Sequence, residues 1–261
     1  MIDLPSPALI GVVHLPALPG AVCHQLPMGE IIDGAVRDAR ALADAAFDAL
    51  IVENFGDVPF ATDAVHPGAV AAMALVADQL RRGTSLPIGI NVLRNDALAA
   101  LGIAAAVGAA FVRVNVHSGV SATDQGLIEG RAEHTLQYRK RLGHRVAILA
   151  DVHVKHAAPL SQPDLACAAR DTAYRGLADG LIVTGRATGE PASPDHLRRV
   201  QAAVPDRRVY VGSGVTAETV RVLLEKCAGV IVGSAIMAGG RAGGVIDAES
   251  ARELARAAGR L

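Results

Sequence analysis

Two apolar runs that stop at glycine and serine decide the fold: Val209-Tyr210-Val211-Gly212-Ser213-Gly214-Val215-Thr216 and Gly229-Val230-Ile231-Val232-Gly233-Ser234. A helical pattern follows the first run, with Thr216 as its candidate N-cap. Small residues at neighbouring strand ends expose backbone N–H groups, and the loops after strands 7 and 8 of a (β/α)8 barrel hold phosphate in this way. The pattern therefore predicts phosphate-binding residues at Ser213, Gly214, Gly233 and Ser234. The alternative is that these glycines only form tight turns.

Similar short apolar runs recur along the rest of the chain, each followed by a helical pattern. Further strands are expected at 9–14, 49–52, 87–92, 111–116, 146–150 and 180–185. Helices are expected at 32–46, 69–80, 96–107, 132–142, 161–177, 194–203 and 248–258, with polar loops at 117–130 and 153–156. Eight strands alternating with helices predict a single α/β domain over 1–261, a (β/α)8 (TIM) barrel with a parallel eight-stranded core. An open doubly wound sheet is the alternative, but no GxGxxG motif follows the first strand.

The composition narrows the functional classes. Hydrophobic residues make up 51% and charged residues 20%, as in a globular protein. A formal net charge of -1 argues against nucleic-acid binding, and three cysteines without CxxC spacing argue against a disulfide framework. The sequence has neither a signal-peptide pattern nor a long apolar stretch, which predicts a cytoplasmic protein without membrane insertion. It shows no required cofactor, and a homo-oligomer fits this fold.

Polar residues at the C-terminal ends of barrel strands are candidates for the site. Glu53, Asn91, Asn115 and Asp151 are expected to ring one end of the barrel, where unpaired polar groups would be costly. Any one of them alone could simply bond the backbone. Glu53 and Asp151 are the acid–base candidates, because two carboxylates in different surroundings can serve as acid and base. Lys155 is expected to neutralise an oxyanion or lie near Asp151; a Schiff base is an alternative that its place in a loop disfavours.

Other polar residues near the same strand ends are expected to line the site: His14, Asn54, Arg94, Asn95, Arg113, His117, Asp124, His153 and Thr184. Arg113 could pair with Glu53 or Asp151, or meet an anionic ligand. A divalent metal on Asp151 and on histidines 14, 117, 153 and 156 is an alternative, but the spacing matches no common closed site. No residue is therefore assigned to a metal.

Eight segments resemble the BtpA family, and the resemblance extends over nearly the whole chain. They are Gly11-Val12-Val13-His14-Leu15, Val52-Glu53-Asn54-Phe55-Gly56-Asp57, Gly89-Ile90-Asn91-Val92-Leu93-Arg94-Asn95-Asp96, Phe111-Val112-Arg113-Val114-Asn115-Val116-His117, Thr123-Asp124-Gln125-Gly126, Ala150-Asp151-Val152-His153-Val154-Lys155-His156-Ala157, Val183-Thr184-Gly185 and Gly212-Ser213-Gly214-Val215-Thr216. The resemblance implies a phosphate-binding (β/α)8 barrel. The family's namesake is linked to photosystem I biogenesis or stability in cyanobacteria, and other members occur in bacteria without photosynthesis, some near sugar-uptake genes.

The chain departs from the family pattern after Gly233-Ser234. A lysine is expected a few residues on, but the chain reads Ala235-Ile236-Met237-Ala238-Gly239-Gly240. A phosphate at this place would depend on backbone N–H groups or on Arg241.

Two functions fit these observations. The first is an enzyme that acts on a small phosphorylated sugar or nucleotide by acid–base chemistry, as an isomerase, a lyase or a hydrolase of a glycosidic bond. The second is a non-catalytic assembly or stability factor of the photosystem I biogenesis type, which predicts a large exposed apolar patch. The scarcity of aromatic residues, 3% of the chain, favours the enzyme because binding hot spots are rich in them.

Overall fold

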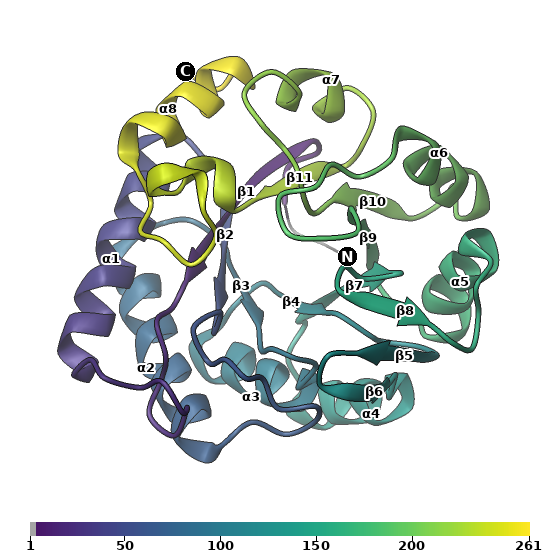
Figure 1. Cartoon of the computed structure of the whole chain (residues 1–261), viewed down its shortest axis with the longest axis horizontal. Helices are drawn as coiled ribbons and strands as arrows, with labels where there is room; N and C mark the ends of the chain where they lie inside the picture. Colours follow the sequence, from purple (N-terminus) through teal and green to yellow (C-terminus); the bar gives the residue numbers. More distant parts are fainter. Residues whose placement is uncertain (1–3) are drawn as a thin grey trace.

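The computed structural model describes residues 4–261, and its centre is a closed barrel of parallel strands (Figure 1). The strand order is β1-β11-β10-β9-β7-β4-β3-β2. Their bounds are β1 Ala8–His14, β2 Ala49–Glu53, β3 Ile88–Asn91, β4 Phe111–Val114, β7 Ala147–Val152, β9 Gly180–Val183, β10 Arg208–Val211 and β11 Gly229–Val232. The predicted TIM barrel is confirmed.

Helices form a ring outside the barrel (Figure 1). They are α1 Met28–Asp44, α2 Pro67–Gly83, α3 Ala97–Val107, α4 Ala132–Leu142, α5 Leu165–Arg170 with its π-helical continuation η1 Asp171–Arg175, α6 Pro194–Ala203, α7 Val220–Leu224 and α8 Ala248–Ala257. Two 3-10 turns, η2 Ser234–Ile236 and η3 Ala238–Gly240, follow β11. The bounds predicted for α4 and α6 are confirmed.

Both faces of each barrel strand are buried, which is why the strands read as continuous apolar runs. On β1, Leu9 and Val13 pack in the layer between barrel and helices, whereas Ile10 and Val12 pack in the barrel interior. Ala49 and Ile51 of β2 belong to the same interior cluster. Its other members include Phe111, Ala147, Leu149, Ile182, Tyr210 and Ile231. The alternation follows from the two-residue period of a strand.

The expected polar loop at 117–130 contains a β-hairpin, so that prediction was wrong. Strands β5 Val120–Thr123 and β6 Gly126–Glu129 pair in an antiparallel register, and β8 Ala157–Pro159 joins them in the order β6-β5-β8. The Thr123 hydroxyl closes the turn, since it donates to the Gly126 carbonyl and accepts from the Gln125 N–H. The side chains of these strands are mostly exposed or half-buried, so they lack the apolar signature of the barrel strands.

Two predicted helix starts were also wrong. Helix α7 begins at Val220, because the Thr216 N–H donates to the Thr219 hydroxyl in a preceding turn. Helix α5 begins after Asp164, whose carboxylate accepts from the Cys167 N–H, whereas the Ser161 hydroxyl accepts from the hairpin at Val120. In the described part of the chain, no helix has the length and apolar character needed to cross a membrane.

Candidate functional site

The two-residue alternation that points apolar side chains into the barrel also points polar side chains inward at the C-terminal ends of the strands, where they form a polar ring. We call this end of the barrel the mouth. At the C-terminal end of each barrel strand, the last inward position of the strand or the first position after it is polar or glycine. These positions are His14, Glu53, Asn91, Arg113, Asp151, Thr184, Gly212 and Gly233, one from each strand of the barrel. Strand register aligns His14 with Glu53, Glu53 with Asn91 and Asn91 with Arg113. The pleat of the barrel therefore brings together side chains that are distant in sequence.

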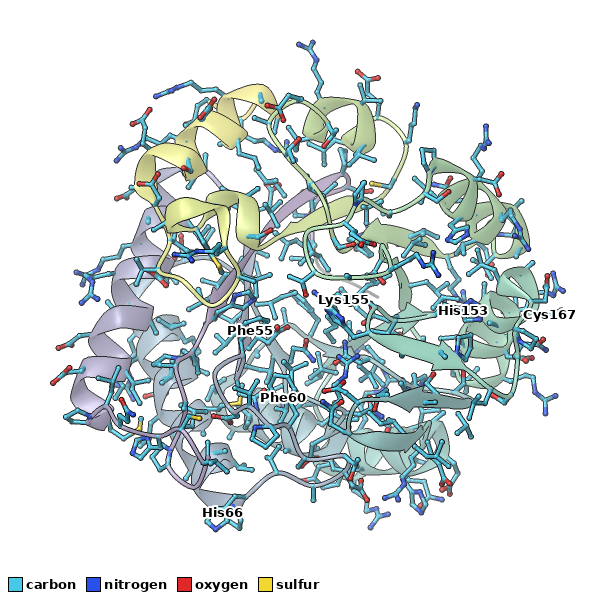
Figure 2. All side chains as sticks on the ribbon, viewed as in Figure 1. Phe55, Phe60, His66, His153, Lys155 and Cys167 are labelled. Atoms are coloured by element: carbon cyan, nitrogen blue, oxygen red, sulfur yellow. The ribbon has the colours of Figure 1, made fainter. Side chains whose placement is uncertain are left out.

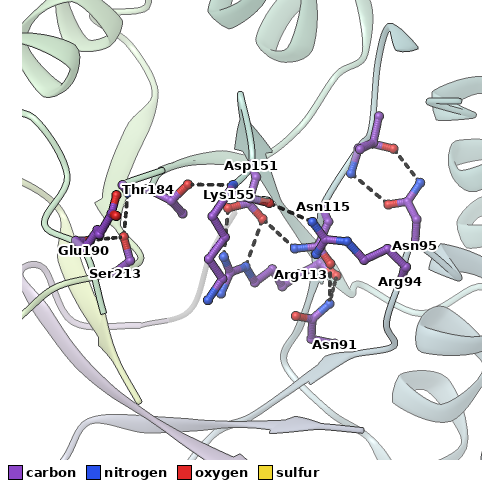
Figure 3. A network of polar contacts seen from close by, with 12 residues as sticks. Asn91, Arg94, Asn95, Arg113, Asn115, Asp151, Lys155, Thr184, Glu190 and Ser213 are labelled. Atoms are coloured by element: carbon purple, nitrogen blue, oxygen red, sulfur yellow. Dashed lines mark hydrogen bonds and ion pairs between the residues drawn. The ribbon is translucent and has the colours of Figure 1, made fainter. Parts of the chain in front are cut away.

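Arg113 and Asp151 form a buried bidentate ion pair at the mouth (Figure 3). Arg113 Nε lies 2.9 Å from Asp151 Oδ2 and Arg113 Nη2 lies 2.8 Å from Oδ1. Burial opposes the charged form of Arg113, but the Asp151 carboxylate raises the pKa of the guanidinium above its ordinary value. Asn115 Nδ2 donates to Asp151 Oδ2 at 3.0 Å, so both carboxylate oxygens of Asp151 have partners. Of the two partners predicted for Arg113, the structure selects Asp151.

Asn91 extends this network toward β3. Its Nδ2 donates to the Arg113 carbonyl at 3.2 Å and to Asn115 Oδ1 at 3.1 Å. Its Oδ1 is buried without a hydrogen-bond partner among residues 4–261. Asn91 and Asn115 therefore act together to hold the ion pair rather than to face solvent.

Glu53 is held in a different way, beside His14. Gly243 N–H donates to His14 Nδ1 at 2.9 Å, and the Phe55 ring stacks on the imidazole at a centroid distance of 4.2 Å. Burial lowers the pKa of His14 to about 4, although the Glu53 carboxylate acts in the opposite direction. His14 is therefore neutral at pH 7, and because Nδ1 accepts, its proton is on Nε2. That nitrogen lies 3.5 Å from Glu53 Oε1, so a neutral N–H faces the carboxylate.

Lys155 reaches the mouth from the segment after β7. Its backbone N–H donates to Thr184 Oγ1 at 3.1 Å, and its carbonyl accepts from Arg94 Nη2 at 2.7 Å, so the backbone is fixed on both sides (Figure 3). Figure 2 shows the side chain near the barrel axis. Burial lowers the pKa of Lys155, and the charge of Arg113 lowers it further.

Two cavities that share part of their lining open around these residues. A narrow cavity of about 30 Å³ lies against the ends of β10 and β11 and is lined by Gly212, Ser213, Gly214, Val215, Gly233 and Ser234. A larger cavity of about 480 Å³ has an apolar wall of Phe55, Val58, Phe60 and Leu93, with Arg94, Asp124, Gln125 and His156 around it. Glu53, Arg113, Lys155 and Thr188 line both cavities. The polar ring therefore stands between a small pocket and a roomier one.

The loop 185–191 covers part of the predicted phosphate-binding residues. Ser213 Oγ accepts from the Gly185 N–H at 2.6 Å and donates to the Glu190 carbonyl at 2.9 Å, so its hydroxyl is already used. Gly214 has a φ of 64°, and a Cβ there would lie 2.2 Å from Pro191 Cα. Glycine at 214 thus serves close packing as well as the turn. Within residues 4–261, the backbone N–H groups of Gly214 and Ser234 donate no hydrogen bond.

Four predicted site residues have structural partners that turn them away from the cavities. Asn54 bonds Asp57 and the Leu93 backbone, and Asn95 exchanges two hydrogen bonds with the Val116 backbone. His117 is buried with Nε2 2.8 Å from the Gly176 carbonyl, and His153 Nε2 lies 2.8 Å from the Gln162 carbonyl. Figure 2 places His153 beside α5, far from Lys155. The histidines considered as metal ligands therefore do not converge on Asp151, and residues 4–261 contain no cluster of three or more His, Cys, Asp or Glu fit for a metal.

Sequence reasoning missed several residues that shape the mouth. Phe55, Val58 and Phe60 form the apolar wall, Thr188 belongs to the covering loop, and Gly243 fixes the His14 ring. The glycine-rich stretch after Ser234 was the only signal for Gly243. Gly243 has a φ of 86°, and a Cβ there would lie close to the Phe55 ring, which explains why this residue is glycine.

Sequence comparison places the chain among proteins of one family. The BtpA family model matches residues 6–260. The photosystem I biogenesis protein BtpA of Synechocystis sp. is 48% identical over 92% of this chain and 83% of its own length. An uncharacterised protein of Thermococcus kodakarensis is 46% identical over 99% of this chain and 98% of its own length.

Comparison with solved structures supports the fold. Phosphoribosyl anthranilate isomerase from Thermus thermophilus superposes with a TM-score of 0.58 over 95% of this chain and 97% of its own, at 14% identity. That identity is too low to carry an activity from one barrel to the other. Family membership is established by the family model and by the two relatives, and not by the solved structure. The chain belongs to the BtpA family.

Proposed function

We propose that the protein is an enzyme that transfers a proton on a small phosphorylated sugar or nucleotide, with Glu53 as the acid–base group. The observation that carries this proposal is the pair of cavities that share Glu53, Arg113, Lys155 and Thr188. A ligand that places its phosphate in the narrow cavity would extend past Glu53 into the larger one. Apolar walls with a few convergent polar groups are typical of small-molecule sites.

The phosphate would lie against the ends of β10 and β11. Unpaired backbone N–H groups at Gly214 and Ser234 are suited to an anion there. The Ser213 hydroxyl takes no part, because it holds the loop 185–191. Arg241, the alternative to the missing lysine, is exposed and does not line this cavity.

Glu53 is better suited to proton transfer than Asp151. Both oxygens of Asp151 are engaged by Arg113 and Asn115, whereas Glu53 has a neutral N–H 3.5 Å away. A carboxylate with a free oxygen can remove a proton from carbon. Glycosidic-bond cleavage needs two reactive carboxylates. The engaged Asp151 therefore favours an isomerase or a lyase.

A binding experiment tests the phosphate part. Thermal unfolding would be followed with inorganic phosphate, ribose 5-phosphate and AMP, and with ribose and adenosine, because a ligand raises the melting temperature by mass action. A Cβ at Gly233 would meet only the His14 ring, at 3.5 Å, so Gly233→Ala adds a methyl group to the narrow cavity without a close steric contact. We expect this variant to fold and to lose the phosphate-dependent shift.

The matched control is Gly83→Ala, where a Cβ meets nothing within 4 Å. It should keep the shift. Equal shifts with phosphorylated and unphosphorylated compounds, or an intact shift in Gly233→Ala, would contradict phosphate binding at this place.

A non-catalytic assembly role is the second candidate, favoured by 48% identity to a relative named for photosystem I biogenesis. The two candidates differ in their need for Glu53. Glu53→Gln should abolish turnover if the protein is an enzyme, whereas an assembly factor would keep its biological role in cells.

A further inference from the structure

Lys155 has surroundings that are unusual for a lysine. Within residues 4–261, its Nζ makes no hydrogen bond and no ion pair, although it stands among charged groups. The groups that act on it are Arg113, Glu53, Asp151 and Arg94. Asp151 is engaged by Arg113, and Glu53 has His14 beside it. Burial and the charges of Arg113 and Arg94 favour the neutral amine, and they outweigh the opposing charges of Glu53 and Asp151, so the pKa of Lys155 is lowered.

The use of lysine here stands out against the rest of the chain. Among 25 basic residues only Lys140, Lys155 and Lys226 are lysines. Lys140 and Lys226 are exposed on the outside of the barrel. Arginine is always charged and cannot act as a nucleophile, whereas a buried lysine can lose its proton. A position that needed only a positive charge could hold arginine, as the mouth does at Arg94 and Arg113.

We propose that Lys155 forms an imine with the carbonyl carbon of an open-chain phosphorylated aldehyde or ketone bound at the mouth. This inference rests on the proposed function, because the phosphate would hold the carbonyl beside Nζ. It also narrows the substrate class, from phosphorylated compounds in general to those that carry a free carbonyl group.

The step uses only groups that line the mouth. The neutral Nζ attacks the carbonyl carbon, and the electron pair of the C=O π bond moves to oxygen, which takes a proton to give a carbinolamine. The nitrogen loses a proton, and its lone pair forms the C=N bond as the hydroxyl group is protonated and leaves as water. Glu53 lines the same cavities and can carry these protons. The imine, once protonated, accepts the electron pair released when Glu53 removes a proton from the adjacent carbon.

Reductive trapping tests the proposal. The protein would be incubated with glyceraldehyde 3-phosphate or dihydroxyacetone phosphate, treated with sodium borohydride, and analysed by intact mass and peptide mapping. Unphosphorylated glyceraldehyde and dihydroxyacetone serve as controls. We expect one reduced adduct per chain, on Lys155, with little or none on the exposed Lys140 and Lys226. Lys155→Arg and Lys155→Met should both lose it.

Melting temperatures measured with the same compounds separate this proposal from the proposed function. A phosphate-dependent shift with no adduct on Lys155 would overturn the imine and leave the phosphate site standing. Equal labelling of all three lysines, or an adduct that does not depend on phosphate, would also overturn it. If the compounds produce no shift in melting temperature and no adduct, both proposals are contradicted. If Lys155→Met fails to fold, peptide mapping of the unsubstituted protein still decides the question.

Discussion

Glu53 and Asp151 stand at the ends of two barrel strands, separated by β3 and β4, and the molecule holds them in opposite ways. Asp151 accepts two hydrogen bonds from Arg113 and one from Asn115. Glu53 faces the Nε2–H of a neutral histidine at 3.5 Å. Sequence position alone makes the two carboxylates equivalent, since both end a barrel strand. The difference teaches that two carboxylates at similar strand ends can be held differently: hydrogen bonds fix Asp151 in the mouth, whereas Glu53 has only the His14 N–H at 3.5 Å beside it.

The largest effect on stability is expected at Asp151. Asp151→Asn leaves the Arg113 charge buried without its counter-ion, and breaking a buried pair in this way costs about 3–5 kcal/mol. Urea unfolding at pH 7 measures the loss. The control is Asp63→Asn, which breaks the exposed pair with Arg131 and should cost less than about 1 kcal/mol. A stable Asp151→Asn protein without turnover would make Asp151 the reactive carboxylate instead.

Glu53 should show the converse behaviour. Glu53→Gln keeps the volume of the side chain and an oxygen to face His14, so the free energy of unfolding should change by less than about 1 kcal/mol. The loss of the acid–base group should lower kcat by about 10²–10⁴-fold on the substrate found by screening. Glu249→Gln on α8 is the control for both measurements. Unfolding as severe as in Asp151→Asn would erase the contrast between the carboxylates.

His14 predicts a pH dependence on the Glu53 side of the mouth. Its pKa is about 4 in the folded protein against an ordinary value of 6.5, so between these values the unfolded chain binds the proton and the folded one does not. Stability is therefore full above pH 6.5 and falls as the pH drops toward 4, by up to about 3 kcal/mol. His14→Gln removes the titration, so the stability difference between the two proteins should shrink over this range. A difference that stays constant with pH would contradict a neutral, buried His14.

Lys155 predicts a small gain in stability when it is replaced. Lys155→Met removes an amine whose charged form burial disfavours, and should stabilise the protein at pH 7 by about 1 kcal/mol. The pKa of Lys155 is lowered from 10.5 in the folded protein, so as the pH rises the folded protein loses this proton before the unfolded chain does. Between the lowered pKa and 10.5 the unsubstituted protein therefore gains stability, and the advantage of Lys155→Met should shrink. The exposed Lys226→Met variant should show no gain. A loss of stability in Lys155→Met would indicate that Lys155 is paired.

The sequence predicted the polar ring because a strand places alternate residues inward. The apolar pattern locates the ends of β2, β4 and β7, and the residues there had to face the mouth. Sequence could not show which side chains pair, because Arg113 and Asp151 meet through register between separate strands. Nor could it show that Gly243 fixes His14 across 229 residues, or that the loop 185–191 occupies the Ser213 hydroxyl. The hairpin of β5 and β6 escaped prediction because most of its side chains are exposed or half-buried and so give no apolar run.

Double-mutant cycles on the two carboxylate pairs test the central contrast most directly. Urea unfolding of the single and double variants gives the coupling free energy of Arg113 with Asp151 and of His14 with Glu53. We expect about 3 kcal/mol for the first pair and less than about 1 kcal/mol for the second at pH 7. Equal coupling energies, or a larger value for His14 with Glu53, would show that Glu53 is bound as firmly as Asp151 and would contradict the assignment of Glu53 as the free carboxylate.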